Sequence, residues 1–187
     1  MKEVLIVSGH PHLDEESFSN RIILERLTGL LPKADILRLD RAHNHYEFDI
    51  KQEQERLKKA DVIVFQFPMF WYGLPALMKK YIDDVFEHGF AYGSTGTCLK
   101  DKTLLVSFTT GGAESDYQYD GEQRYPIEEF LPFLKNFAWY CGMRWGGMVY
   151  TGGLIYLPNQ DEIVRQELKT KAEEHACVLA DKVIQVN

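Results

Sequence analysis

Short apolar runs alternate with amphipathic stretches along the whole chain. The runs are rich in Val, Ile, Leu and Phe and span 3–9, 34–39, 61–67, 102–112 and 143–151. Runs of this kind are typical of strands that are buried on both faces of a parallel sheet. The stretches that carry apolar residues at helical spacing span 19–31, 49–60, 75–86, 126–140 and 161–184. The pattern predicts five strands that alternate with helices.

Strict alternation of strands and helices indicates an α/β fold with a parallel sheet covered on both sides. Five strands fit a doubly wound, flavodoxin-like sheet of order 2-1-3-4-5, as a single domain over 1–187. In such sheets ligands bind beyond the carboxyl ends of the strands, where the strand order reverses. This rule selects the loops 8–19, 68–74 and 109–125 as the candidate site.

Composition and charge narrow the classes of function. A net charge of -7 and a pI near 5.4 argue against a nucleic-acid partner, which needs a clustered positive surface. The cysteines Cys98, Cys141 and Cys177 show no metal-ligand spacing, so no metal site is expected, and reduced thiols in the cytoplasm are the simplest interpretation. No signal peptide is expected, because the apolar run near residue 1 is short.

The apolar segment 62–78 raises the question of membrane insertion. It is interrupted by Gln66, Pro68 and Pro75, whereas a spanning helix needs about 20 clean apolar residues. Insertion into a membrane is therefore not expected.

The first candidate loop, "SGHPHLDEESFSN", joins a predicted strand to a predicted helix. Ser19 is a candidate N-cap, and the free N–H groups of a helix start favour an anion such as a phosphate. An ordinary capped helix after a polar loop would explain the same residues. Neither a Walker A pattern nor a GxGxxG is present, which disfavours a nucleoside triphosphatase or a dinucleotide site of that kind.

The second loop, "PMFWYG", is crowded with aromatic residues. Trp71 and Tyr72 could be core residues, but they fall at the ligand-binding edge, where apolar side chains suit a planar heterocycle. The third loop begins "TTGG", in which Gly111 and Gly112 allow close approach of the backbone and the threonines offer donors. Tyr117 and Tyr119 add phenols. Taken together, the three loops predict an FMN site.

The segments "GHPHLDEESFSN", "FPMFWYGLPALMKKYIDDVF", "HGFAYG" and "TTGG" resemble the flavodoxin-like NAD(P)H:quinone oxidoreductases. The likeness is strongest to their short bacterial branch, which includes general stress protein 14 and the ancillary oxidoreductase of a potassium-efflux system. It implies an FMN site, with FAD as an alternative, in which the phosphate and ribityl chain meet His10, Ser17, Phe18, Ser19 and Asn20. It also implies that the flavin ring meets Pro68, Met69, Phe70, Trp71, Tyr72, Thr109, Thr110, Gly111, Gly112 and Tyr117.

The same resemblance implies a two-step reaction, in which NAD(P)H reduces the flavin and a quinone or another flat acceptor then reoxidises it. Trp71 and Tyr117 are the residues expected to contact the exchanging substrates. In the larger animal enzymes a histidine of a proton relay follows, a few residues later, the tyrosine that Tyr117 resembles. This chain has Gln123 in that region, which puts a relay through histidine in doubt. His88 is a candidate substitute, although a histidine at a helix end is more often structural.

Two other functions stay open. The protein could be a regulatory subunit of a membrane potassium-efflux transporter, held at the inner face of the membrane by that partner. It could also be a flavodoxin-type electron carrier, which the long first loop with His10 and His12 disfavours. The resemblance further implies a homodimer, for which Phe70, Phe90 and Tyr92 would be suitable exposed aromatics.

Overall fold

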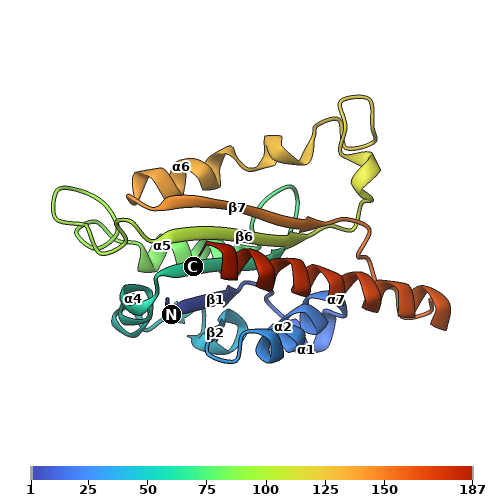
Figure 1. The fold of residues 1–187 in the computed structure, drawn as a ribbon, viewed down its shortest axis with the longest axis horizontal. Helices are drawn as coiled ribbons and strands as arrows, with labels where there is room; N and C mark the ends of the chain where they lie inside the picture. Colours follow the sequence, from blue (N-terminus) through green and yellow to red (C-terminus); the bar gives the residue numbers. More distant parts are fainter. Residues whose placement is uncertain (1, 187) are drawn as a thin grey trace.

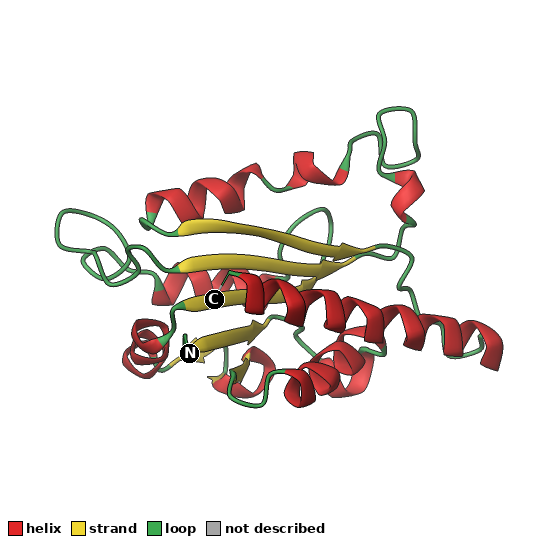
Figure 2. Ribbon diagram, in the orientation of Figure 1, coloured by secondary structure: helices red, strands yellow, loops and turns green. Residues whose placement is uncertain are grey.

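The computed structural model describes residues 2–186. Its main sheet has five parallel strands in the order β2-β1-β5-β6-β7, which is the predicted 2-1-3-4-5 arrangement. Figure 2 shows that the arrowheads of these strands lie at one end of the sheet. The strands are β1 (Val4–Ser8), β2 (Asp35–Arg38), β5 (Val62–Pro68), β6 (Thr103–Thr109) and β7 (Arg144–Thr151). The fold class predicted from the sequence is confirmed.

Helices cover both faces of the sheet (Figure 1). Because successive residues of a strand point to opposite faces, Ile6 and Val64 pack under one helical layer and Leu5 and Phe65 under the other. The first layer consists of α2 (Ser19–Leu30) and α7 (Glu162–Gln185). The second consists of α4 (Ile50–Lys59), α5 (Ala76–Val85) and α6 (Pro132–Tyr140).

Several short elements were missed, because two to four residues carry no readable period. They are α1 (Leu13–Glu16), α3 (Leu39–Ala42), the hairpin β3 (His43–Asn44) and β4 (Glu47–Phe48), and the 3₁₀ turns η1 (Glu114–Asp116) and η2 (Ile127–Phe130). The predicted helix 126–140 is wrong in its first part. It divides into η2 and α6, because Pro132 has no N–H and tolerates only the first turn of a helix.

His175 fixes α7 above the carboxyl ends of two strands. Its buried ring lies with Nε2 2.8 Å from the Ser107 hydroxyl of β6 and with Nδ1 2.8 Å from the Thr151 hydroxyl of β7. Burial lowers the pKa of His175 to about 4, so the ring is neutral at pH 7 and has one donor and one acceptor nitrogen. The helix is thereby held beside the loop that follows β7.

None of the helices within residues 2–186 combines the length and the apolar character that crossing a membrane requires.

Candidate functional site

The three loops selected from the sequence do meet at the carboxyl edge of the sheet. A hollow of about 340 Å³ lies there, between the α2 N-terminus and the ends of β5 and β6. Eleven of the predicted site residues line it: His10, Ser17, Phe18, Ser19, Asn20, Pro68, Met69, Phe70, Thr109, Thr110 and Gly111. The structure therefore brings most of the predicted set together around one space.

The remaining four predicted residues lie outside this hollow. Gly112 and Tyr117 lie together on the loop after β6, and Tyr72 reaches the same region by stacking on Phe130, with ring centroids 5.5 Å apart. Tyr117 meets Phe130 edge-on at 5.9 Å, so Phe130 connects the two tyrosines in one aromatic wall. Trp71 is 94% exposed and is not among the residues that line the hollow.

The start of α2 forms a donor-rich cradle. The Ser17 hydroxyl oxygen accepts a hydrogen bond from the Asn20 N–H at 3.2 Å, so Ser17 performs the capping task that was predicted for Ser19. Ser19 lies in the first turn, and its hydroxyl is buried without a hydrogen-bond partner among the described residues. A buried hydroxyl without a partner is costly, so this hydroxyl would gain from a hydrogen bond with a ligand or with water.

His10 lies beside this cradle with a fixed orientation. Its Nδ1 accepts a hydrogen bond from the His12 N–H at 3.1 Å, which leaves the proton of the neutral ring on Nε2. Burial lowers the pKa of His10, although Glu16 and Asp40 oppose that shift. A neutral donor in this position suits an oxygen of a phosphate or of a sugar alcohol.

A buried amide network lies beneath the hollow. Gln66 of β5 donates to the Asn20 side-chain oxygen at 2.7 Å, and the Asn20 amide donates to the Thr109 hydroxyl at 3.2 Å. The Asn20 side chain therefore ties α2 to β5 and β6, and the network leaves it less available to a phosphate than the sequence suggested. Gln66 was missed as part of the site, because within an apolar strand it reads only as an interruption.

The loop after β6 is held by the chain's own hydrogen bonds. The Thr110 hydroxyl donates to the Gly112 carbonyl at 2.9 Å and lies 3.2 Å from the Tyr150 hydroxyl, while the Thr110 N–H donates to the Thr151 carbonyl. The donors predicted on Thr110 are therefore engaged within the protein. The N–H groups of Gly111 and Gly112 are the donors that this loop offers to a ligand.

The aromatic turn after β5 has a strained backbone. Phe70 and Gly73 exchange two hydrogen bonds of 3.1 Å, and between them Trp71 and Tyr72 adopt φ angles of 46° and 64°. Two positive φ angles in a two-residue hairpin loop are typical of a type I′ turn, which favours Asn and Gly. Bulky residues in this conformation cost roughly 1–2 kcal/mol each, and such strain tends to occur at functional sites.

Tyr117 is nearly buried, and burial raises the pKa of its phenol in spite of a hydrogen bond with Thr110. Gln123 lies next to Gly112, on the same side as Tyr117. A glutamine amide does not titrate, so the doubt about a histidine relay holds for this geometry. His88 follows the C-terminus of α5. The segment after α5 lies at the end of the sheet opposite the arrowheads (Figure 1), so this histidine is too remote to serve in a relay.

Four residues of the hollow were missed: Glu16, Leu154, Ile155 and Tyr156. Glu16 ends the short helix α1, and the other three follow β7. The rule that ligands bind at the carboxyl ends of strands, applied to β7 as well, would have selected the loop 152–160.

Among the aromatics expected at the surface, Phe70 is exposed, whereas Phe90 is buried and Tyr92 is half-buried. The expectation for Phe90 was wrong, because its loop folds back onto the core.

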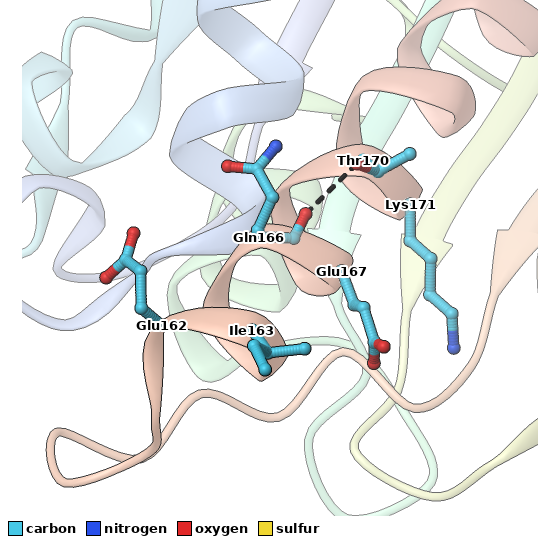
Figure 3. Close-up of a pocket in the computed structure, with 6 residues that line it drawn as sticks. All are labelled: Glu162, Ile163, Gln166, Glu167, Thr170 and Lys171. Carbon is cyan, nitrogen blue, oxygen red and sulfur yellow. Dashed lines mark hydrogen bonds between the residues drawn. The ribbon is translucent and has the colours of Figure 1, made fainter.

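A larger hollow, of about 560 Å³, follows the first turns of α7. The residues that line it all come from this helix, and Figure 3 shows that Gln166 points to one side of the helix while Glu167 and Lys171 point to the other. We regard it as an open helix surface, and the smaller hollow at the sheet edge as the candidate site.

Residues 2–176 match the sequence family described as the flavodoxin-like fold. The chain belongs to this family. A relative from Bacillus subtilis, the uncharacterized NAD(P)H oxidoreductase YrkL, is 40% identical over 163 residues, which cover 86% of this chain and 91% of the relative. The resemblance to flavodoxin-like NAD(P)H oxidoreductases drawn from the sequence is thus confirmed.

Solved flavodoxin-like structures agree with the fold. General stress protein 14 from Treponema denticola, in complex with FMN, has a TM-score of 0.85 at 24% identity, covering 96% of this chain and 99% of its own. An NADPH-quinone reductase from P. pentosaceus has a TM-score of 0.74 at 24% identity, covering 94% and 98% respectively. At this identity both comparisons speak for the fold alone.

Proposed function

We propose that the protein is an FMN-dependent NAD(P)H:quinone oxidoreductase. The observation that carries this proposal is the buried Ser19 hydroxyl at the start of α2, which has no hydrogen-bond partner within residues 2–186 and lies in the same hollow as the apolar residues Met69 and Phe70. An anion cradle joined to an apolar wall fits a phosphorylated planar heterocycle. The oxidoreductase relative and the FMN-bound structure of the same fold support the choice of flavin.

The cradle would hold the phosphate through the Ser17 and Ser19 hydroxyls and the first N–H groups of α2. The His10 Nε2–H would meet the ribityl chain or a phosphate oxygen. Met69 and Phe70 would lie along the ring, and the N–H groups of Gly111 in the lining and of Gly112 just beyond it would face its polar end. Each of these assignments uses a donor or a surface that the fold leaves available.

FMN, when bound, accepts a hydride from a reduced nicotinamide and passes it to an acceptor. The chain's part is to exclude water from the apolar wall and to stabilise negative charge through the Gly111 and Gly112 N–H groups. Nicotinamides and quinones are both flat and mostly apolar. Each would therefore bind at the same place, beside Phe70 and Tyr117, one after the other. This shared use predicts ping-pong kinetics.

Tyr117 is the proposed hydrogen-bond donor to the acceptor. Because burial raises the pKa of its phenol, the hydroxyl keeps its proton at pH 7 and can donate to a quinone oxygen. Gln123 can orient an acceptor beside Tyr117 but cannot supply a proton. Protons for the product would therefore come from Tyr117 or from solvent.

A steady-state panel tests this function. The protein reconstituted with FMN should oxidise NADH or NADPH with several quinones, giving the parallel double-reciprocal lines of a ping-pong reaction. The flavin-free protein is the control and should be inactive. Transfer to one-electron acceptors without any reduction of quinones would instead support an electron carrier. FMN-loaded protein that oxidises neither nicotinamide would contradict the proposal.

Replacing Trp71 with Asn should separate stability from turnover. Asn accepts a positive φ more readily than Trp, and the exposed indole makes little packing contact, so the free energy of unfolding should rise by about 1 kcal/mol. Loss of the aromatic surface should lower kcat/KM by roughly tenfold, which corresponds to about 1.4 kcal/mol. Urea denaturation and steady-state kinetics measure the two effects. Unchanged kinetics would remove Trp71 from the site.

A further inference from the structure

Three side chains from different elements form a column beside the cradle. Phe18, which stands between the two cradle serines, stacks on Tyr156 with ring centroids 4.6 Å apart and planes inclined by 19°. The Arg165 guanidinium carbon lies 5.5 Å from the centroid of the Phe18 ring. The three residues come from the N-cap of α2, the loop after β7, and α7. Stacking and cation–π contact fix their mutual positions.

The column stands at one particular end of the hollow. Phe18 and Tyr156 both line it, and Phe18 is covalently joined to Ser17 and Ser19. The apolar wall of Met69 and Phe70 comes from the turn that follows β5, which is a different part of the chain. Two rings of the column therefore line the hollow beside the cradle serines, where a phosphate would bind.

Charge gives the column a second property. Among the described residues that line the hollow, Glu16 is the one acidic side chain, and the lowered pKa of His10 keeps the imidazole uncharged at neutral pH. A bound phosphate would therefore find no cationic side chain among these residues. Arg165 supplies positive charge at the Phe18 ring, and it also forms a long ion pair of 3.8 Å with Glu162.

We propose that the Phe18–Tyr156–Arg165 column closes the phosphate end of the site and selects flavin mononucleotide over flavin adenine dinucleotide. FAD is FMN extended through its phosphate by adenosine monophosphate, so it needs an open path past the cradle, which the stacked rings block. The terminal phosphate of FMN also carries more charge than either phosphate of a dinucleotide, and Arg165 offsets that charge. The proposal rests on the flavin site of the proposed function and assigns its selectivity to residues of this chain.

Flavin binding tests the proposal without any turnover. The flavin-free protein is titrated with riboflavin, FMN and FAD, and the quenching of flavin fluorescence gives each Kd. The wild type should bind FMN at least about 100-fold more tightly than FAD, a difference of about 2.7 kcal/mol. Tyr156→Ala should bind FAD more tightly and reduce the ratio to roughly tenfold or less. Tyr156→Phe keeps the stack and should keep the wild-type ratio.

Arg165→Gln isolates the charge. It should weaken FMN binding by roughly fivefold, as expected for loss of a partly exposed ion pair, and leave riboflavin, which has no phosphate, unchanged. The salt dependence of FMN binding should decrease in the same variant. Circular dichroism of each variant establishes that the fold is intact. Equal losses for riboflavin and FMN would contradict a role of Arg165 at the phosphate.

The outcomes separate this proposal from the proposed function. Equal affinity of the wild type for FMN and FAD would overturn the closure, and so would an unchanged ratio in Tyr156→Ala, while the flavin site would stand in both cases. Failure of the wild type to bind any of the three flavins would overturn the flavin site itself. A raised FAD affinity confined to Tyr156→Ala is the result that the column predicts.

Discussion

Ser19→Ala should stabilise the flavin-free protein and weaken its binding of FMN, two effects of opposite sign. The Ser19 hydroxyl is buried in the first turn of α2 without a protein partner within residues 2–186. Removing a buried hydroxyl that has no partner relieves a desolvation cost of about 1–3 kcal/mol. The same substitution removes a hydrogen bond to a charged phosphate, which is worth about 1.5–3 kcal/mol, so the Kd for FMN should rise by roughly 10–100-fold.

Ser17→Ala is the matched control for this result. The Ser17 oxygen caps α2 by accepting the Asn20 N–H, so its loss should lower the free energy of unfolding by about 1 kcal/mol and also weaken FMN binding. The two neighbouring serines should therefore shift stability in opposite directions and FMN affinity in the same direction. Urea denaturation and flavin titration measure both quantities. A destabilised Ser19→Ala would show that this hydroxyl has a structural partner and would remove the main support for the cradle.

The second large effect is a loss of stability in mild acid caused by His175. Burial lowers the pKa of His175 from 6.5 to about 4, so the folded state binds this proton less readily than the unfolded state. The stabilisation that the neutral His175 provides is fully present above the pKa of 6.5 in the unfolded state. It is lost as the pH falls from about 6.5 towards the folded-state pKa of about 4. Since one pKa unit corresponds to about 1.4 kcal/mol, the loss is on the order of 3 kcal/mol.

His175→Gln removes the titrating ring and keeps an amide that can meet the Ser107 and Thr151 hydroxyls. The variant should be less stable than the wild type at pH 7, and its stability should depend less on pH between 4.5 and 7. Urea denaturation at several pH values measures the difference between the two slopes. Identical slopes would mean that His175 titrates alike in the folded and unfolded states.

The strand order could be predicted because the signal for it is repeated. Each buried strand is a run of Val, Ile, Leu and Phe, and each alternates with an amphipathic helix, so errors at single boundaries do not change the topology. The rule for ligand position in such sheets then selected the edge at which the candidate hollow lies. Most of the residues around the hollow followed from these two steps.

The residues that could not be predicted depend on tertiary contacts. Gln66 belongs to the site because its amide meets Asn20, which lies far away in the sequence. Tyr156 belongs to it because β7 delivers the following loop to Phe18. The sequence predicts Ser19 as the N-cap of α2, whereas Ser19 is the first residue of the helix and Ser17 caps it. Helix propensity does not locate the start of a helix to a single residue.

An anaerobic absorption titration of the FMN-loaded protein measures hydride transfer itself. Addition of an equimolar amount of NADPH or NADH should bleach the visible flavin absorbance, and an equimolar amount of a quinone should then restore it. This pair of changes would establish both half-reactions with one sample. Flavin absorbance that neither nicotinamide bleaches, in protein shown to hold FMN, would contradict the proposed oxidoreductase.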